Sequence, residues 1–327
     1  MNAAKQNLVI VLLTLAAIGL LVAVYFTPVW WVALKAPNYP AQTFPDGIRI
    51  HFHVDGVFNG CRPRESQEVM EREALDCKHE MDTINHYVGM YPIAAGAPVE
   101  RAMSPFVFTL LGVMLVAFLM PGRRSRTAVL LAGSLAIGGW MSAALYSEGG
   151  LKYMSPGYKT DLMDTMDYEW EDVKDWSGVM AVEESYREAL GRYFRDQQEM
   201  QRRTEIVLNI LTVVNWGILA AMAVLVVGAW KLRPFYWLLI AVPLLLPLFF
   251  IVDYSGWLWW FGHNLSDMGA FTVKPFMPTV FGDGKVAQFS THSYPYEGFG
   301  LMACSSLLLL FAALFRARQV RRGEFRI

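Results

Sequence analysis

The chain of 327 residues is 54% hydrophobic and only 17% charged, with a mean hydropathy of +0.31. One soluble core cannot bury so much apolar surface, which excludes an ordinary water-soluble domain and indicates an integral membrane protein. Three cysteines are too few for a disulfide-based scaffold. The net charge of −1 becomes informative only when it is divided between the two sides of a membrane.

Six apolar segments are long enough to cross a bilayer, which needs about 20 helical residues. The first, residues 7–27, predicts an uncleaved anchor helix because no small-residue cleavage site clearly follows it. Short basic turns join the second span to the third and the fourth to the fifth, so we expect each of these pairs to form a helical hairpin. The other spans are predicted at residues 104–120, 128–147, 205–230, 235–254 and 298–315.

Basic residues gather in the segments that six spans would place on one side of the membrane. These segments contain eleven Lys and Arg residues against one acid, Glu324, and leave 17 basic and 28 acidic residues elsewhere. The positive-inside rule therefore predicts a bacterial inner-membrane protein with both termini in the cytoplasm and its large loops in the periplasm. All six histidines fall in the outer loops.

The predicted fold class is all-α, with six transmembrane helices and a small mixed α/β periplasmic portion built from the outer loops. In the first outer loop, alternating polar and apolar residues at 48–55 predict a β-strand. The second outer loop is acidic and ends in an amphipathic helix. The expected organisation is an N-terminal helix (1–27), outer segments (28–103, 148–203 and 255–297), two transmembrane hairpins (104–147 and 204–254), and a last helix with a basic cytoplasmic tail (298–327).

Potential metal ligands are concentrated in the fifteen residues from Asp76 to Met90. Thiolate, imidazole and thioether groups are the ligands that soft metals, copper above all, prefer. The alternative is that an ordinary ordered loop uses a few His and Met residues for packing. A short helix from Asp76 to about Val88 would place His79 and His86 on one side, because they are seven residues apart. The stretch contains Cys77, His79, Met81, His86 and Met90.

We predict that His86 and Met90 form the core of one outer metal site, because a single His–Met pair gives the weak, exchangeable binding that a delivery factor needs. His79, or the pair His51 and His53, would complete the site, although two histidines on one strand face are also typical of a plain solvated edge. A histidine on the third outer loop is a second candidate ligand. The predicted ligands are His86, Met90, His79, His51, His53 and His263.

Cys61 and Cys77 have two possible roles. In an oxidising periplasm they would form a disulfide that closes a 17-residue loop, worth about 3 kcal/mol in the chain-entropy model. They could instead supply thiolate ligands to a metal, but the absence of Cys-x-x-Cys spacing favours the disulfide. The third cysteine, Cys304, lies in the last span, and we expect it to be a buried packing residue.

Five short blocks carry a resemblance to a known family. Together they resemble NosB-like polytopic membrane proteins, which are encoded beside nitrous oxide reductase and its maturation factors. The resemblance implies a setting in periplasmic copper-enzyme assembly or in the electron supply to such an enzyme. The chain departs from the family in a charged insertion at roughly 58–80 and in residues 266–268. The blocks are residues 44–48, 84–90, 262–265, 275–278 and 288–291.

We therefore expect an accessory or maturation factor that handles copper for a periplasmic or membrane copper enzyme or electron-transfer protein, rather than an enzyme. A second hypothesis is a metal-free docking subunit for a periplasmic redox partner or respiratory complex. A third is a membrane enzyme acting on a quinol or lipid at the aromatic outer interface. The spans are poor in ionisable residues apart from Asp253, which argues against a secondary transporter. No motif indicates a nucleotide or nucleic-acid partner.

Overall fold

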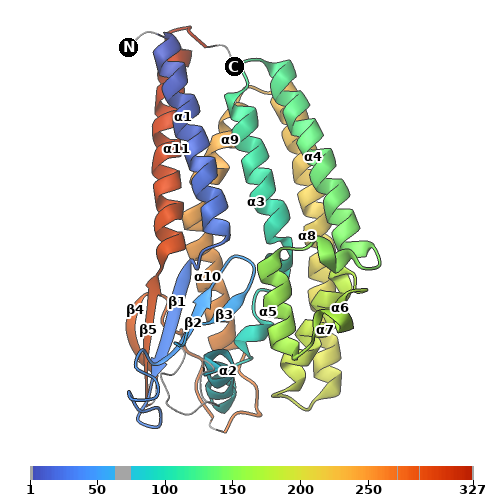
Figure 1. Ribbon diagram of the computed structural model, residues 1–327, viewed down its shortest axis with the longest axis vertical. Coiled ribbons are helices and arrows are strands. Elements are labelled where there is room, and N and C mark those ends of the chain that lie inside the picture. The colour runs from blue at the N-terminus through green and yellow to red at the C-terminus, as the bar shows by residue number, and fades with distance from the viewer. Residues whose placement is uncertain (1–2, 63–74, 271, 287, 326–327) are drawn as a thin grey trace.

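The computed structural model describes residues 3–62, 75–270, 272–286 and 288–325. A long helical bundle occupies one end, and a small β-sheet with short helices occupies the other (Figure 1). Both chain termini lie at the free end of the bundle. The end that contains the β-sheet is called the sheet end, and the end that contains both chain termini is called the terminal end.

Within the described ranges, five helices are long and apolar enough to cross a membrane. A sixth span results if α9 (Phe235–Leu244) and α10 (Leu246–His263), which meet at a bend of 58°, are counted as one. The chain therefore has the helices of a multi-pass membrane protein. The five spans are α1 (Ala3–Tyr25), α3 (Pro98–Leu119), α4 (Arg123–Tyr146), α8 (Gln197–Lys231) and α11 (Glu297–Arg321).

The bend between α9 and α10 falls at Leu245, with Pro243 and Pro247 on either side. Proline lacks the backbone N–H and clashes with the preceding turn, which makes it the usual cause of a sharp kink. The kink changes the neighbours of this span, since α3, α11 and α8 all pack on α9, whereas α10 packs chiefly on α11. This arrangement opens space between α10, α3 and α8 at the sheet end.

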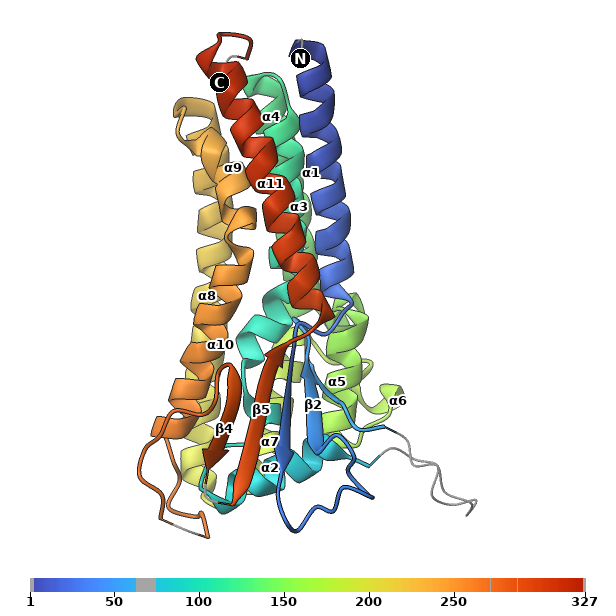
Figure 2. The same cartoon turned by 90° about the vertical axis from the view of Figure 1, so that its left-hand side faces the viewer.

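Five antiparallel strands form one sheet in the order β3-β2-β1-β5-β4. The central strand β1 continues from α1, and β5 leads directly into α11, so the sheet lies beneath these two helices (Figure 2). The strand predicted at 48–55 is confirmed as β2, whose Ile48 and Ile50 are fully buried. The strands are β1 (Trp30–Lys35), β2 (Ile48–Phe52), β3 (Val57–Asn59), β4 (Gly282–Val286) and β5 (Phe289–Pro295).

Short helices surround the sheet and the base of the bundle. The helix predicted from Asp76 to about Val88 is confirmed as α2 (Cys77–Tyr87), with the Asp76 carboxylate accepting a hydrogen bond from the backbone N–H of His79 at 2.9 Å. The helix ends where Gly89 adopts a φ of +79°. The others are η1 (Ile93–Ala95), η2 (Gly150–Tyr153), α5 (Pro156–Met166), α6 (Trp170–Val173) and α7 (Gly178–Gly191).

Two sequence predictions about these helices are wrong. The single amphipathic helix expected at 179–203 is divided between α7 and the start of α8. The Asp196 carboxylate accepts hydrogen bonds from the backbone N–H groups of Gln198 and Glu199 and starts the second helix. Cys304, expected to be buried, is exposed on α11, because that face of the helix has no protein neighbour.

A buried ion cluster joins the short helices to the bundle. Asp161 of α5 accepts from Lys78 of α2 at 2.5 Å and from Arg101 of α3 at 3.1 Å, and all three side chains are about nine-tenths buried or more. Asp82 of α2, itself buried, accepts the backbone N–H of Ile93 at 2.6 Å. Since such groups are costly to bury unless they are paired, the cluster holds α2, α3 and α5 in one arrangement.

Candidate functional site

The two cysteines of the first outer segment are bonded to each other. Cys61 and Cys77 form a disulfide with their Cα atoms 6.0 Å apart, and the Cys77 side chain is fully buried. The bond ties the first residue of α2 to the chain that follows β3. Neither sulfur is then a thiolate ligand. Most of the predicted charged insertion, residues 63–74, lies outside the described residues.

His79 and His86 lie on the same side of α2, against one tyrosine. The Nδ1 atom of His79 is 3.1 Å from the hydroxyl of Tyr193, and the His86 ring packs on Tyr193 and Phe194 with centroids 5.7 and 5.5 Å away. The Nδ1 atom of His86 is buried without a hydrogen-bond partner among the described residues. An imidazole nitrogen of this kind is free to accept a hydrogen bond or a metal.

The remaining predicted ligands lie elsewhere. His51 stacks on Tyr296, and His53 contacts the edge of the Phe58 ring. Burial lowers the pKa of both histidines to about 4, so both are neutral at neutral pH. His263 stacks on Trp259, with its Nδ1 atom 2.8 Å from that residue's carbonyl oxygen.

No three His, Cys, Asp or Glu side chains within the described ranges gather in a way that could hold one metal ion. A thioether can also bind a soft metal, and Met90 is buried and lines a cavity together with His53. The predicted copper site therefore stays a prediction. The structure brings together His79 and His86 on α2, whereas His51, His53 and His263 lie outside this helix.

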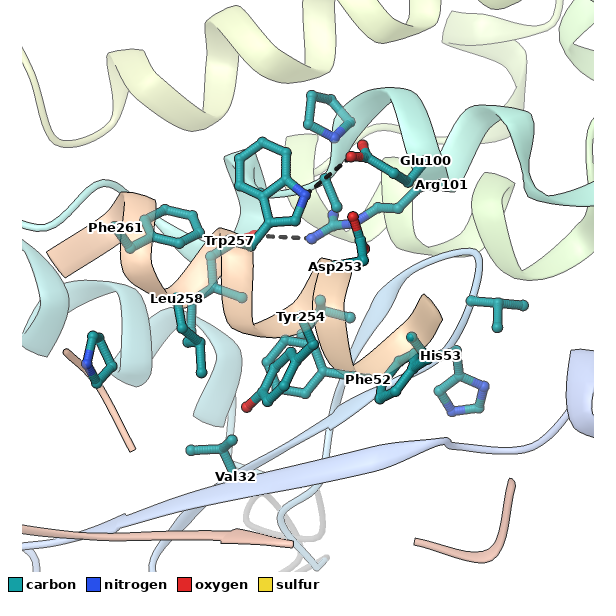
Figure 3. A pocket seen from close by; sticks show the side chains of 18 of the residues that line it. Val32, Phe52, His53, Glu100, Arg101, Asp253, Tyr254, Trp257, Leu258 and Phe261 are labelled. Atoms are coloured by element: carbon teal, nitrogen blue, oxygen red, sulfur yellow. Dashed lines mark hydrogen bonds between the residues drawn. The ribbon is translucent and has the colours of Figure 1, made fainter. Parts of the chain in front are cut away.

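The cavity lies where the bundle meets the sheet and has a volume of about 680 Å³ (Figure 3). Its walls come from the start of α3, from one face of α8 and from most of α10, and strands β1 and β2 and helix α2 close it at the sheet end. The lining is almost entirely apolar. The α8 face consists of Val207, Ile210, Val214 and Ile218, a spacing of three or four residues that places them on one side of the helix.

Two carboxylates interrupt this apolar lining on one wall. Glu100 accepts a hydrogen bond from the indole N–H of Trp257 at 3.0 Å, and Asp253 lies beside it on α10 (Figure 3). Both side chains are exposed, and neither forms an ion pair with any residue that the structure describes. The neighbouring Arg101 does not neutralise them, because its guanidinium donates to Asp161 and to the carbonyl groups of Ile93 and Ala94.

A polar side chain also reaches the cavity from α2. Asn85 lines it, is only 7% exposed, and has an amide nitrogen that is buried without a partner in the described part of the chain. Buried amides nearly always find a partner, so this group is available to a ligand. In the sequence, Asn85 stands out only as a neighbour of His86.

Sequence reasoning singled out Asp253 because a carboxylate within a span is rare. It missed Glu100, because a glutamate in the first turn of a helix is ordinary and favours the helix dipole. The apolar residues of α8 and α10 that line the cavity could not be recognised from the sequence, because lipid-facing and cavity-facing residues have the same composition.

The fold and the cavity define a class: a multi-pass membrane protein with a small antiparallel sheet over an apolar cavity at one end of its bundle. Comparison with protein-family models, curated proteins and solved structures finds no match to this chain. The class is therefore assigned from the structure itself, and the resemblance to NosB-like proteins stays a prediction.

Proposed function

We propose that this protein binds one amphipathic, lipid-like molecule in the cavity between its bundle and its sheet. The observation that carries the proposal is the cavity itself, about 680 Å³ in volume and apolar except for a few polar groups. Sites for small molecules in proteins typically have 300–1,000 Å³ and this composition. The apolar body of the ligand would lie among α3, α8 and α10.

The polar groups indicate the chemistry of the head group. Glu100 and Asp253 present carboxylate oxygens, which accept hydrogen bonds and attract positive charge. A ligand that donates hydrogen bonds or carries a cation, such as a hydroxyl or ammonium head group, would therefore fit this wall. Asn85 offers an amide on the α2 side of the cavity.

The ligand would come from the bilayer rather than from water. Ile210 of α8 and Phe249 of α10 line the cavity and are also 48% and 52% exposed. The apolar lining thus continues onto surfaces that a membrane would cover, so a lipid-like molecule could enter without crossing water. We further propose, from the charge distribution, that the sheet end faces the periplasm.

The test is native mass spectrometry of the full-length protein in mild detergent. We expect one lipid-like adduct per chain, and we expect Val107→Trp to remove it, because Val107 lines the cavity and the indole would occupy its volume. Val116→Trp is the matched control, since Val116 lies on the same helix but is exposed and does not line the cavity. Equal adduct occupancy in both variants would refute the proposal.

Copper handling for a periplasmic or membrane enzyme is a second proposal, favoured by the unpartnered Nδ1 atom of His86 and the position of His79 beside it around Tyr193. Elemental analysis of protein purified with and without copper tests it. His86→Ala should then lose the metal, whereas His292→Ala should retain it, because His292 is paired with Asp283 on the sheet. Copper binding that survives in His86→Ala, together with loss of a partner protein, would instead favour the docking hypothesis.

A further inference from the structure

Two arginines are buried at the terminal end of the bundle without a counter-charge among the residues that the structure describes. Arg126, in the first turn of α4, and Arg316, near the end of α11, are each only 1% exposed. In both side chains the Nε and Nη2 atoms have no hydrogen-bond partner among the residues that the structure describes. Neither guanidinium forms an ion pair with any residue in the described part of the chain.

The groups around Arg316 satisfy only part of its guanidinium. Its Nη1 atom donates to the side-chain oxygens of Asn7 at 3.0 Å and Gln319 at 2.9 Å. The ring of Phe325 lies over the guanidinium carbon at 4.0 Å. The Tyr236 side chain also interacts with the guanidinium of Arg316. The Nε and Nη2 atoms form no hydrogen bond of standard geometry with any described residue.

Aromatic rings connect Arg316 to Arg126. The guanidinium carbon of Arg126 lies 4.2 Å from the centroid of Tyr236, and Tyr236 packs on Phe118 and Phe325 with centroids 5.1 and 5.7 Å apart. Phe118 and Phe325 both lie near the guanidinium of Arg316. The two arginines therefore flank one aromatic cluster.

Two buried positive charges around one cluster need an anion. A guanidinium stays protonated inside proteins, and burial of a charge without an ionic partner is strongly unfavourable. Stacking on aromatic rings compensates only in part. The unused edge of each arginine, Nε with Nη2, is the pair of donors that binds carboxylate or phosphate oxygens in a bidentate manner.

We propose that the unused guanidinium edges of Arg126 and Arg316 bind phosphate at the terminal end of the bundle. Nine further Lys and Arg residues lie in the sequence segments at this end, and Glu324 is the single acid in those segments. Such an excess of positive charge attracts anions. The phosphate belongs either to the head group of an anionic phospholipid or to free phosphate.

The ring of Phe325 covers Arg316, so an anion would reach the unused donors as this ring moves aside. The chain after α11 turns back at Gly323, whose φ of +73° favours glycine, and this turn carries Phe325 onto the cluster. Phe325→Ala should therefore strengthen phosphate binding rather than weaken it.

The experiment uses the full-length protein in detergent, stripped of lipid, and follows the midpoint of thermal unfolding. Inorganic phosphate and micelles containing phosphatidylglycerol are the two probes. Phosphatidylcholine, which is zwitterionic and has no net charge, is the comparison. We expect a rise of several degrees with at least one anionic probe in the parent. A rise with inorganic phosphate identifies a free-anion site, and a rise with phosphatidylglycerol alone identifies a head-group site.

The double variant Arg126→Gln/Arg316→Gln should lose this rise, whereas Arg123→Gln, which changes an exposed arginine of the same helical turn, should keep it. Arg126→Lys covers the case in which the double variant does not fold, because lysine keeps the charge but lacks the bidentate edge and should bind about tenfold more weakly. No rise in the parent with either probe, or an undiminished response in the double and Lys variants, would overturn the proposal.

Discussion

Each end of the bundle has charged side chains without an ionic partner among the described residues. These are carboxylates at the sheet end and guanidinium groups at the terminal end, and their surroundings differ. At the sheet end, Glu100 and Asp253 face an apolar cavity of about 680 Å³. At the terminal end, Arg126 and Arg316 are enclosed by side chains, with only one edge of each guanidinium unused. The sheet end can therefore select a ligand by volume and shape, whereas the terminal end can select only by charge and donor geometry.

The difference follows from how the helices pack. At the terminal end α9 lies against α3, and Tyr236 and Phe118 fill the space between them. Beyond the bend at Leu245, α10 keeps its packing on α11 but no longer fills the space beside α3 and α8. The same span is thus closely packed in one half and borders a cavity in the other.

The largest effect is expected where the sheet end is attached to the bundle. Asp161→Ala leaves Lys78 and Arg101 buried without their partner and should lower the free energy of unfolding by about 3–5 kcal/mol. Asp167→Ala is the control, because its pair with Arg192 is largely exposed and should contribute about 1 kcal/mol or less. Unfolding in denaturant measures both, and equal losses would show that the buried cluster does not hold this end.

The second largest effect that we expect is a pH dependence of folding stability caused by Asp82. Burial raises its pKa to about 7, above the ordinary value of a carboxyl group, although Lys78, Arg101 and two backbone N–H groups favour the charged form. The folded state then binds the extra proton, so stability should fall as pH rises from about 4 to about 7, by at most about 1.4 kcal/mol per pH unit.

The variant Asp82→Asn isolates the contribution of Asp82 to the pH dependence of stability. A variant is needed because the folded-state pKa values of His51 and His53 are lowered to about 4, so these two histidines make stability rise between pH 4 and 6.5. The measurement is the unfolding free energy of parent and variant at pH 5 and pH 7.5. The parent should lose more stability than the variant on going to pH 7.5. Parallel pH profiles would show that Asp82 is charged throughout this range.

The polar wall of the cavity should contribute to ligand affinity rather than to folding. Asp253→Asn and Glu100→Gln each remove a charged acceptor, which is worth about 1.5–3 kcal/mol, so occupancy by the native adduct should fall roughly tenfold or more. Asp267→Asn, an exposed carboxylate on the loop after α10, should leave occupancy unchanged. If all three variants retain the adduct equally, the head group lies elsewhere in the cavity.

The smallest effect is expected at the terminal end. In protein stripped of lipid and phosphate, Arg126→Met replaces an unpaired buried charge by an apolar chain and should raise the free energy of unfolding by about 1 kcal/mol. Addition of the anion should make the parent more stable than the variant, because only the parent binds the anion. Thermal unfolding with and without the probe measures this, and a variant that is less stable in both conditions would show that Arg126 is already satisfied.

Sequence alone predicted the elements that depend on neighbouring residues. Apolar runs of about 20 residues identify the membrane helices, alternation at 48–55 identifies β2, and Asp76 followed by Gly89 brackets α2. Each of these signals is local, since it arises from helix or strand periodicity, from a cap, or from a turn. For the same reason His79 and His86, seven residues apart on one helix, could be placed on one side of it.

Only the tertiary structure decided what lies between these elements. Trp30–Lys35 pairs with Phe289–Pro295 across more than 250 residues of chain, and no local pattern encodes that pairing. The cavity exists because one bend turns α10 away from α3. The two arginines, from α4 and α11, flank one aromatic cluster because both reach rings that pack around Tyr236 of α9. Sites of this kind depend on how separate helices pack, and the period of apolar residues that predicts a helix does not say which neighbour each face will meet.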